Sequence, residues 1–145
     1  MAEEADPSTL DGLIATDDEY LVFCGVVGLG RQLADGCDDG NALVQRAAVA
    51  GICEPRLLRT PDAAQAAVDT CERVTASLAA RPLDERRLPS VRTLRQALGY
   101  CWSVAVAADP ERAMPRFLAL TASPHPDVAW IVHDNRGKAH LVTLL

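Results

Sequence analysis

Cysteine and histidine are the residue types in this sequence that could bind a metal ion or act as a nucleophile. No two histidines are four residues apart, no HExxH motif is present, and the cysteines form no CxxC pair. The spacings that typical metal sites use are therefore missing, and we expect no metal site and no cofactor. The residues concerned are Cys24, Cys37, Cys53, Cys71 and Cys101, together with His125, His133 and His140.

Catalysis by a cysteine requires a thiolate, which forms most readily at a partly exposed site near positive charge. Cys24, Cys71 and Cys101 instead fall in apolar helical patterns, and Cys37 lies among aspartates that oppose ionisation. A cysteine and a histidine distant in sequence could still meet in the folded chain, but we predict no catalytic residue and no enzymatic activity. The odd number of cysteines favours a reducing compartment, so we expect the protein in the cytoplasm.

A glycine-rich stretch also has to be weighed as a nucleotide-binding loop. Gly25, Gly28 and Gly30 are spaced GxxGxG rather than GxGxxG, and no strand precedes them. The stretch follows a helical pattern, so we interpret the glycines as places where two helices approach closely.

The most basic part of the chain is the segment 81–95. Its five arginines against Asp84 and Glu85 give a net charge of +3 over fifteen residues. One interpretation is a solvated connector whose arginines pair locally with these two acids. The alternatives are a patch for an acidic protein partner and a nucleic-acid contact, although the latter normally needs a broader cationic footprint. The arginines are Arg81, Arg86, Arg87, Arg92 and Arg95.

Six helices are predicted to position these residues, and apolar side chains recur along them at a spacing of 3.6 residues. The expected first helices of three pairs start near residues 17, 62 and 111, and the second helices cover 42–53, 90–108 and 126–136. Thr60 and Ser90 are the expected N-caps of the two long helices, and Gly137 the expected stop of the last. On the helix before Pro124, the predicted buried stripe is Met114, Phe117, Leu118 and Thr121.

The sequence DVAWIV, beginning at Asp127, resembles the second helix of a HEAT repeat, except that Ala129 occupies a position that is usually basic. The stretches 21–36, 46–58 and 94–110 are also similar to HEAT-repeat proteins of actinobacteria. This resemblance implies an all-α, HEAT-like right-handed solenoid of about three helix pairs, shortened relative to such proteins. We assign residues 1–12 to an acidic, flexible tail and residues 13–145 to the helical repeat domain.

Composition agrees with closely packed helices, because 49% of the 145 residues are hydrophobic but only 4% are aromatic. The net charge of −6 is unevenly placed, since residues 1–39 contain ten acids and a single arginine. We find no signal peptide, and the longest apolar run, residues 20–30, is too short to span a bilayer. We expect no membrane association.

A short helical repeat without catalytic motifs most resembles a protein-interaction or scaffold module. Trp102 and Trp130 lie beside core stripes, where they either pack at the edge of the core or anchor a partner. The alternative function is nucleic-acid association through the segment 81–95. The apolar C-terminal residues either fold back onto the last helix pair or join two copies in a homodimer; they are Leu141, Val142, Leu144 and Leu145. The expected binding surface for an unidentified protein partner is Arg46, Arg92, Arg95, Gln96, Trp102, Trp130 and Asn135.

Overall fold

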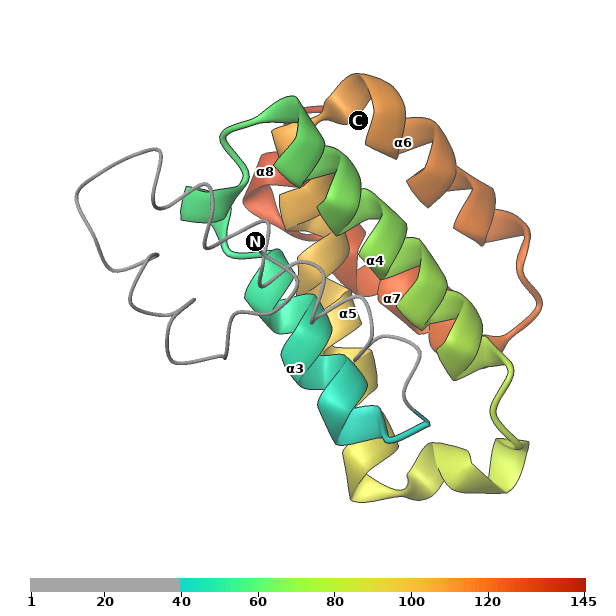
Figure 1. Ribbon diagram of the computed structural model, residues 1–145. Coiled ribbons are helices and arrows are strands. Elements are labelled where there is room, and N and C mark those ends of the chain that lie inside the picture. The colour runs from blue at the N-terminus through green and yellow to red at the C-terminus, as the bar shows by residue number, and fades with distance from the viewer. Residues whose placement is uncertain (1–39) are drawn as a thin grey trace, which may run out of the picture.

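The structure, a computed structural model, describes residues 40–145, and this part of the chain is helical without any strand. Figure 1 shows the helices in order, running alternately up and down. Three short 3₁₀ helices, η1 (Pro55–Leu57), η2 (Leu83–Arg87) and η3 (Leu120–Ala122), lie in the connections. The α-helices are α3 (Ala42–Ile52), α4 (Pro61–Ala79), α5 (Pro89–Ala108), α6 (Pro110–Ala119), α7 (Pro126–Arg136) and α8 (Ala139–Val142).

The all-α prediction is therefore confirmed for this part of the chain. The tail at 1–12, the helix expected from residue 17, Cys24, Cys37 and the glycine-rich stretch lie outside the described residues. No helix within residues 40–145 combines the length and apolar composition needed to cross a membrane.

Side-chain caps fix where several helices begin, as the sequence predicted. Thr60 Oγ1 accepts a hydrogen bond from the Ala63 N–H at 3.2 Å and satisfies one of the exposed donors of the first turn of α4. Proline at the first position of α4, α6 and α7 suits a site where no backbone donor is needed. The helices α3, α6 and α7 are capped in the same way, by Asn41, Asp109 and His125.

The predicted cap of α5 is wrong. This helix begins at Pro89, so Ser90 is already inside it, and Leu88 takes the N-cap position without a side-chain hydrogen bond. The reason is the fixed φ of proline, which is compatible with the first helical residue and moves the N-cap two positions earlier, from Ser90 to Leu88.

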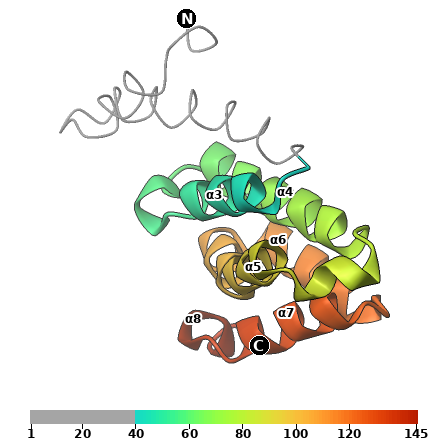
Figure 2. The same ribbon diagram turned by 90° about the horizontal axis from the view of Figure 1, so that it is seen from below.

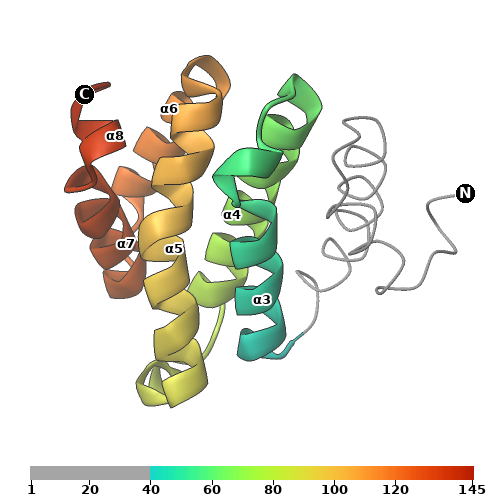
Figure 3. The same cartoon turned by 90° about the vertical axis from the view of Figure 1, so that its left-hand side faces the viewer.

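The helices form two layers, and α5 is the central helix of one of them. Helices α3, α5 and α7 follow one another in one layer, and α4 and α6 lie beside each other in the second, as Figures 2 and 3 show. Helix α5 contacts α3, α4, α6 and α7, and the residues of its apolar stripe, Leu94, Leu98, Cys101 and Ala105, are buried. The corresponding stripe of α4 is also buried, which places both long helices in one continuous core; its residues are Ala64, Val68, Cys71, Thr75 and Leu78.

Trp102 lies inside this core rather than at its edge. The side chain is 0% exposed, its Nε1 donates to Thr75 Oγ1 at 2.9 Å, and its ring lies 5.8 Å from that of Phe117. The predicted stripe of α6 needs correction as well, because Leu118 and Thr121 are exposed while Phe117 is fully buried. The α-helix ends at Ala119 and continues as η3 from Leu120, and the buried residues of α6 are Ala113 and Phe117.

The C-terminal residues divide between the two predicted outcomes. Leu141, on α8, is 0% exposed and belongs to the core, whereas Val142, Leu144 and Leu145 are exposed. Of the four apolar residues, Leu141 therefore folds back onto the core and the other three do not.

Candidate protein-binding surface

The outward side of α5 carries a row of exposed polar and aromatic side chains. Arg92, Gln96 and Tyr100 are four residues apart, so they lie on one face of the helix, and Tyr100 is 48% exposed. We call these three residues the α5 row. Arg46 is exposed on the neighbouring α3, and neither α3 nor α5 contains an aspartate or glutamate. The row therefore presents positive charge with no acidic residue on its own helix.

An open apolar groove adjoins the α5 row. Its volume is about 330 Å³, and Tyr100 belongs to both features. The groove lies between the turn that connects α3 to α4 and the C-terminal half of α5. Its lining is Pro55, Leu58, Tyr100, Val104, Ala107 and Ala108. A partner could thus contact a cation, an aromatic ring and an apolar depression along one helix.

A buried carboxylate joins α7 to the segment 81–95. Asp127, in the first turn of α7, is 1% exposed. Arg86 binds it with two hydrogen bonds, from Nε to Oδ2 at 2.7 Å and from Nη2 to Oδ1 at 2.9 Å. Arg95 adds a third, from Nη1 to Oδ1 at 2.9 Å. This arrangement, the Asp127 cluster, holds η2, α5 and α7 together.

The charge state of Asp127 follows from these contacts. The hydrogen bonds from Arg86, together with the one from Arg95, lower the pKa of the carboxyl from 3.8 to about 2, against the opposing effect of burial. Asp127 is therefore ionised at neutral pH and offsets one of the two arginine charges. The sequence alone does not indicate this cluster, because both arginines are more than thirty residues away from Asp127 in sequence.

Arg95 also stacks on Trp130, with its guanidinium carbon 4.7 Å from the ring centroid. The ring lies directly over Gly99 of α5, where an added Cβ would be 2.8 Å from Trp130 Cζ3. Both side chains are partly exposed, so this stacked pair lies at the surface beside the α5 row.

Two residues of the expected binding surface lie in the interior. Trp102 and Asn135 are both 0% exposed, which corrects their predicted position. Asn135 Oδ1 accepts from the Ser103 N–H at 2.8 Å, and its Nδ2 donates to the Leu98 and Ile131 carbonyls at 2.9 and 2.7 Å. Asn135 thus fastens α7 to α5. Of the seven predicted residues, Arg46, Arg92, Arg95, Gln96 and Trp130 remain at least partly exposed.

The arginines of the segment 81–95 are largely engaged within the molecule. Arg81 donates to the Gly40 carbonyl, to Gln45 Oε1 and to Glu85, which brings α3 and η2 together. The predicted local pairing thus holds for Arg81 and Glu85, whereas Arg86 and Arg95 reach Asp127 instead. Arg87 and Arg92 are the exposed arginines of this segment.

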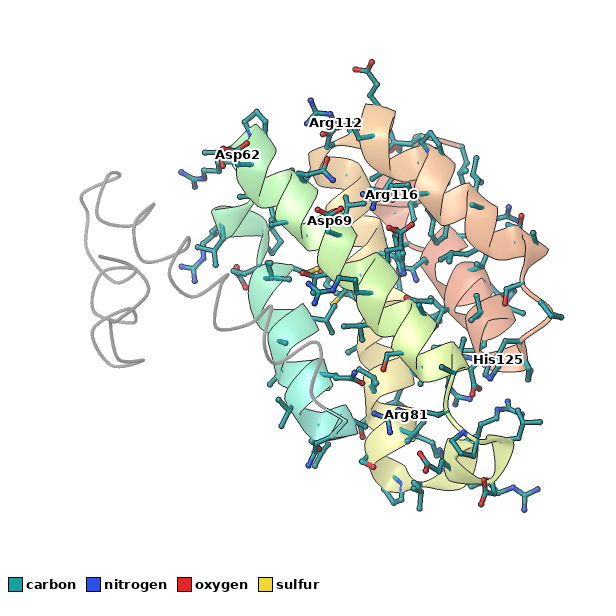
Figure 4. The ribbon with its side chains drawn as sticks, turned by 45° about the vertical axis from the view of Figure 1, so that its right-hand side comes forward. Asp62, Asp69, Arg81, Arg112, Arg116 and His125 are labelled. Carbon is teal, nitrogen blue, oxygen red and sulfur yellow. The ribbon has the colours of Figure 1, made fainter. Side chains whose placement is uncertain are left out.

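Acidic side chains gather on the opposite layer. Arg116 of α6 reaches across to α4, where it pairs with Asp69 at 2.7 Å and with Glu72, as Figure 4 shows for Arg116 and Asp69. Asp62 and Glu111 are exposed on the same two helices. The two layers therefore differ in charge.

The described cysteines lie in the core, whereas His125 and His133 lie at the start and on the exposed face of α7. His125 Nδ1 accepts from the Asp127 N–H at 3.2 Å, and His133 is exposed on α7. Cys53, Cys71 and Cys101 are buried. Across the part of the chain that the structure describes, no three His, Cys, Asp or Glu residues are grouped so that they could hold a metal ion.

Comparison with known proteins adds no assignment: no family model matches the sequence, and neither curated proteins nor solved structures give a match. The resemblance to HEAT repeats therefore stays a prediction from the sequence. The candidate surface therefore rests on the structure alone, and it consists of the α5 row, the groove and the stacked pair of Arg95 and Trp130.

Proposed function

We propose that this chain is a non-enzymatic, HEAT-like right-handed solenoid of about three helix pairs that binds a protein partner and serves as a scaffold in the cytoplasm. The pairs would be α4 with α5 and α6 with α7, preceded by a pair that ends in α3. The placement of α3, α5 and α7 in one layer supports this arrangement. Each of these helices would be the second of its pair.

The observation that carries the binding proposal is the α5 row with its adjoining groove. An interface is typically anchored by an aromatic or arginine side chain next to a pocket, and Arg92 and Tyr100 provide both beside an apolar depression. The partner that fits is a protein segment with an acidic side chain for Arg92 and an apolar side chain for the groove. Arg46, Gln96 and the stacked pair of Arg95 and Trp130 extend the surface on both sides.

Nucleic-acid association through the segment 81–95 is the weaker candidate. Binding without sequence preference depends on several cations that contact phosphates. Arg81, Arg86 and Arg95 already bind oxygen atoms of the protein, which leaves Arg87 and Arg92 as the exposed cations. This pair is a narrow footprint for a phosphate backbone.

A pull-down from host lysate tests the proposal, using the full chain with and without nuclease and identifying bound proteins by mass spectrometry. The test variant is Arg92→Ala with Tyr100→Ala. The matched control is Arg112→Ala with Leu118→Ala, which removes one exposed arginine and one exposed apolar side chain from the opposite layer. We expect the test variant to lower recovery of a defined protein about tenfold and the control to leave it unchanged.

Equal recovery with both variants would contradict the assignment of the α5 row. Loss of all bound material on nuclease treatment, with a steep decrease in binding as salt rises, would favour the nucleic-acid alternative instead. An interface anchored by Tyr100 and the groove is expected to depend much less on salt.

Pairing of two copies through the exposed Val142, Leu144 and Leu145 is a further proposal, supported by their exposure beside the buried Leu141. Sedimentation of the chain with and without Val142→Asp and Leu145→Asp tests it. A dimer that these changes convert to a monomer would support the pairing, and an unchanged mass would exclude it.

A further inference from the structure

Three thiols from separate segments meet in the core. Cys53 follows the last turn of α3, Cys71 lies on α4 and Cys101 lies on α5. The Sγ atoms of Cys53 and Cys71 are 3.6 Å apart, and both side chains are buried. Eighteen residues separate the two in sequence, so the fold alone creates this contact.

Cys53 lies at the end of a helix, whereas Cys71 lies inside one. Cys53 is the C-cap of α3, its N–H makes the last backbone hydrogen bond of that helix, to the Val49 carbonyl at 3.2 Å, and Glu54 and Pro55 follow it immediately. A disulfide needs an S–S distance of about 2.0 Å, which small changes of the Cys53 backbone and of both side-chain torsions could reach. Cys71 lies in the middle of α4 and would stay in place.

Cys101 is held differently from the other two. Its thiol donates to the Val49 carbonyl at 3.7 Å, and Cys101 lies in the middle of α5. A hydrogen bond with Cys53, together with burial, raises the pKa of the Cys101 thiol, so this group stays protonated. The raised pKa therefore argues against Cys101 as the attacking thiolate.

We propose that Cys53 and Cys71 form a redox pair, which closes to an intramolecular disulfide when the chain meets a small two-electron oxidant such as hydrogen peroxide. The Cys53 thiol loses its proton, and the thiolate attacks one peroxide oxygen. The O–O bond breaks, Cys53 becomes a sulfenic acid, and the departing hydroxide takes up the proton from the thiol to form water. The Cys71 sulfur then forms the S–S bond as a second water leaves. In total, the two thiols lose two electrons and two protons, and the peroxide takes up these electrons and protons to become two water molecules.

This disulfide would join the end of α3 to the middle of α4. It removes conformational freedom from the unfolded chain and should raise the melting temperature by about 5 °C. The inference is independent of the proposed binding function, since none of the three thiols belongs to the α5 row or the groove.

Peptide mapping of the full chain tests the pairing, because trypsin places each of the five cysteines on a different peptide. The folded chain is treated with hydrogen peroxide, unfolded in the presence of iodoacetamide, and digested without reductant. We expect a single disulfide-linked species that joins peptide 47–56, with Cys53, to peptide 60–73, with Cys71. Reductant should separate them and reverse the rise in melting temperature.

Three controls keep the outcome decisive. Cys101→Ser should give the same linked species, whereas Cys53→Ala should give none and show no rise in melting temperature. Oxidation in urea should give mixed pairings, since the fold no longer selects partners. A link from Cys53 to Cys101 in the folded chain, the same mixture with and without urea, or full alkylation of Cys53 and Cys71 would each overturn the proposal.

Discussion

Asp127 is the side chain through which η2, α5 and α7 are joined. Burying a carboxylate is unfavourable unless hydrogen bonds and opposite charge compensate for the lost hydration. Arg86 and Arg95 provide three hydrogen bonds, and their side chains stay 33% and 23% exposed, so neither cation loses its water completely. The lowered pKa of Asp127 shows that the attraction outweighs the burial.

The pH dependence of stability follows from this pKa. Asp127 has a pKa of about 2 in the folded chain and an ordinary value of 3.8 when unfolded, so the unfolded state takes up a proton first as the pH falls. Its contribution of about 2 kcal/mol is complete above about pH 5 and is lost as the pH approaches 2. Urea unfolding over this range should show the wild-type free energy of unfolding decreasing by about 2 kcal/mol more than that of Asp127→Asn.

The comparison with Asp127→Asn isolates one group, because all other carboxyls titrate in both chains. Parallel pH profiles for the two proteins would show that the pairing with Arg86 and Arg95 does not contribute to stability.

Gly99 allows the close approach of Trp130 to α5. Alanine would gain up to about 1 kcal/mol of helix propensity, but its Cβ would lie 2.8 Å from both Trp130 Cζ3 and Asp134 Oδ2. Because the ring is stacked on Arg95, overpacking should exceed the gain, and we expect Gly99→Ala to lower the free energy of unfolding by about 1 kcal/mol. Chemical denaturation measures this effect.

Gly137→Ala is the matched control for that substitution. Its Cβ would meet only the Asp134 carbonyl at an ordinary 3.5 Å, so the change should stay within about 0.5 kcal/mol. A stabilised Gly99→Ala protein would mean that Trp130 moves aside at little cost.

Among the elements, α5 determines how the others are placed, since it contacts α3 and α7 in its own layer and α4 and α6 in the other. Its contact with α7 combines apolar packing of Ile131 and Val132 with the buried amide of Asn135. The amide binds two backbone groups of α5, the Ser103 N–H and the Leu98 carbonyl, which fixes the register between the helices.

A substitution of Asn135 tests how much the hydrogen bonds of its amide contribute to the free energy of unfolding. Asn135→Ala leaves buried backbone groups without their partner, and we expect a loss of about 3 kcal/mol in the free energy of unfolding. His133→Ala, on the exposed face of the same helix, should change it by less than about 0.5 kcal/mol. Similar values for the two variants would show that Asn135 does not hold α7 in place.

In the whole molecule, the two layers differ in both charge and packing role. Helices α3, α5 and α7 together carry four arginines against two aspartates, Asp127 and Asp134, whereas α4 and α6 carry three arginines against four acidic residues. An acidic partner would therefore favour the layer that contains the α5 row. The last turn, α8, completes the packing by placing Leu141 against the core.

The C-terminal turn offers a matched test of this packing. Leu141→Ala removes a fully buried side chain and should lower the free energy of unfolding by about 3 kcal/mol. Leu144→Ala makes the same chemical change at an exposed position and should have an effect below about 0.5 kcal/mol. Equal effects in thermal or urea unfolding would mean that α8 is not part of the cooperative core.

The sequence by itself determined helices α3 to α7 and most of their ends, because those signals are local, whereas the short α8 was not predicted. The Thr60–Pro61 and Asp109–Pro110 pairs mark starts through capping and a fixed φ, and apolar residues at 3.6-residue spacing identify the buried side of α4. The exposure of Arg92 and Gln96 also followed from that periodicity. The same spacing continued to Tyr100 and could have identified it as part of the surface.

Only the tertiary structure decided which side chains meet across the helices. Arg86 lies 41 residues from Asp127, and the Ser103 N–H lies 32 residues from Asn135, so no local pattern links them. The same reason explains the complete burial of Trp102, since Thr75 and Phe117 come from other helices. Local sequence sets the shape of each helix, whereas burial and pairing depend on the neighbours that packing brings to it.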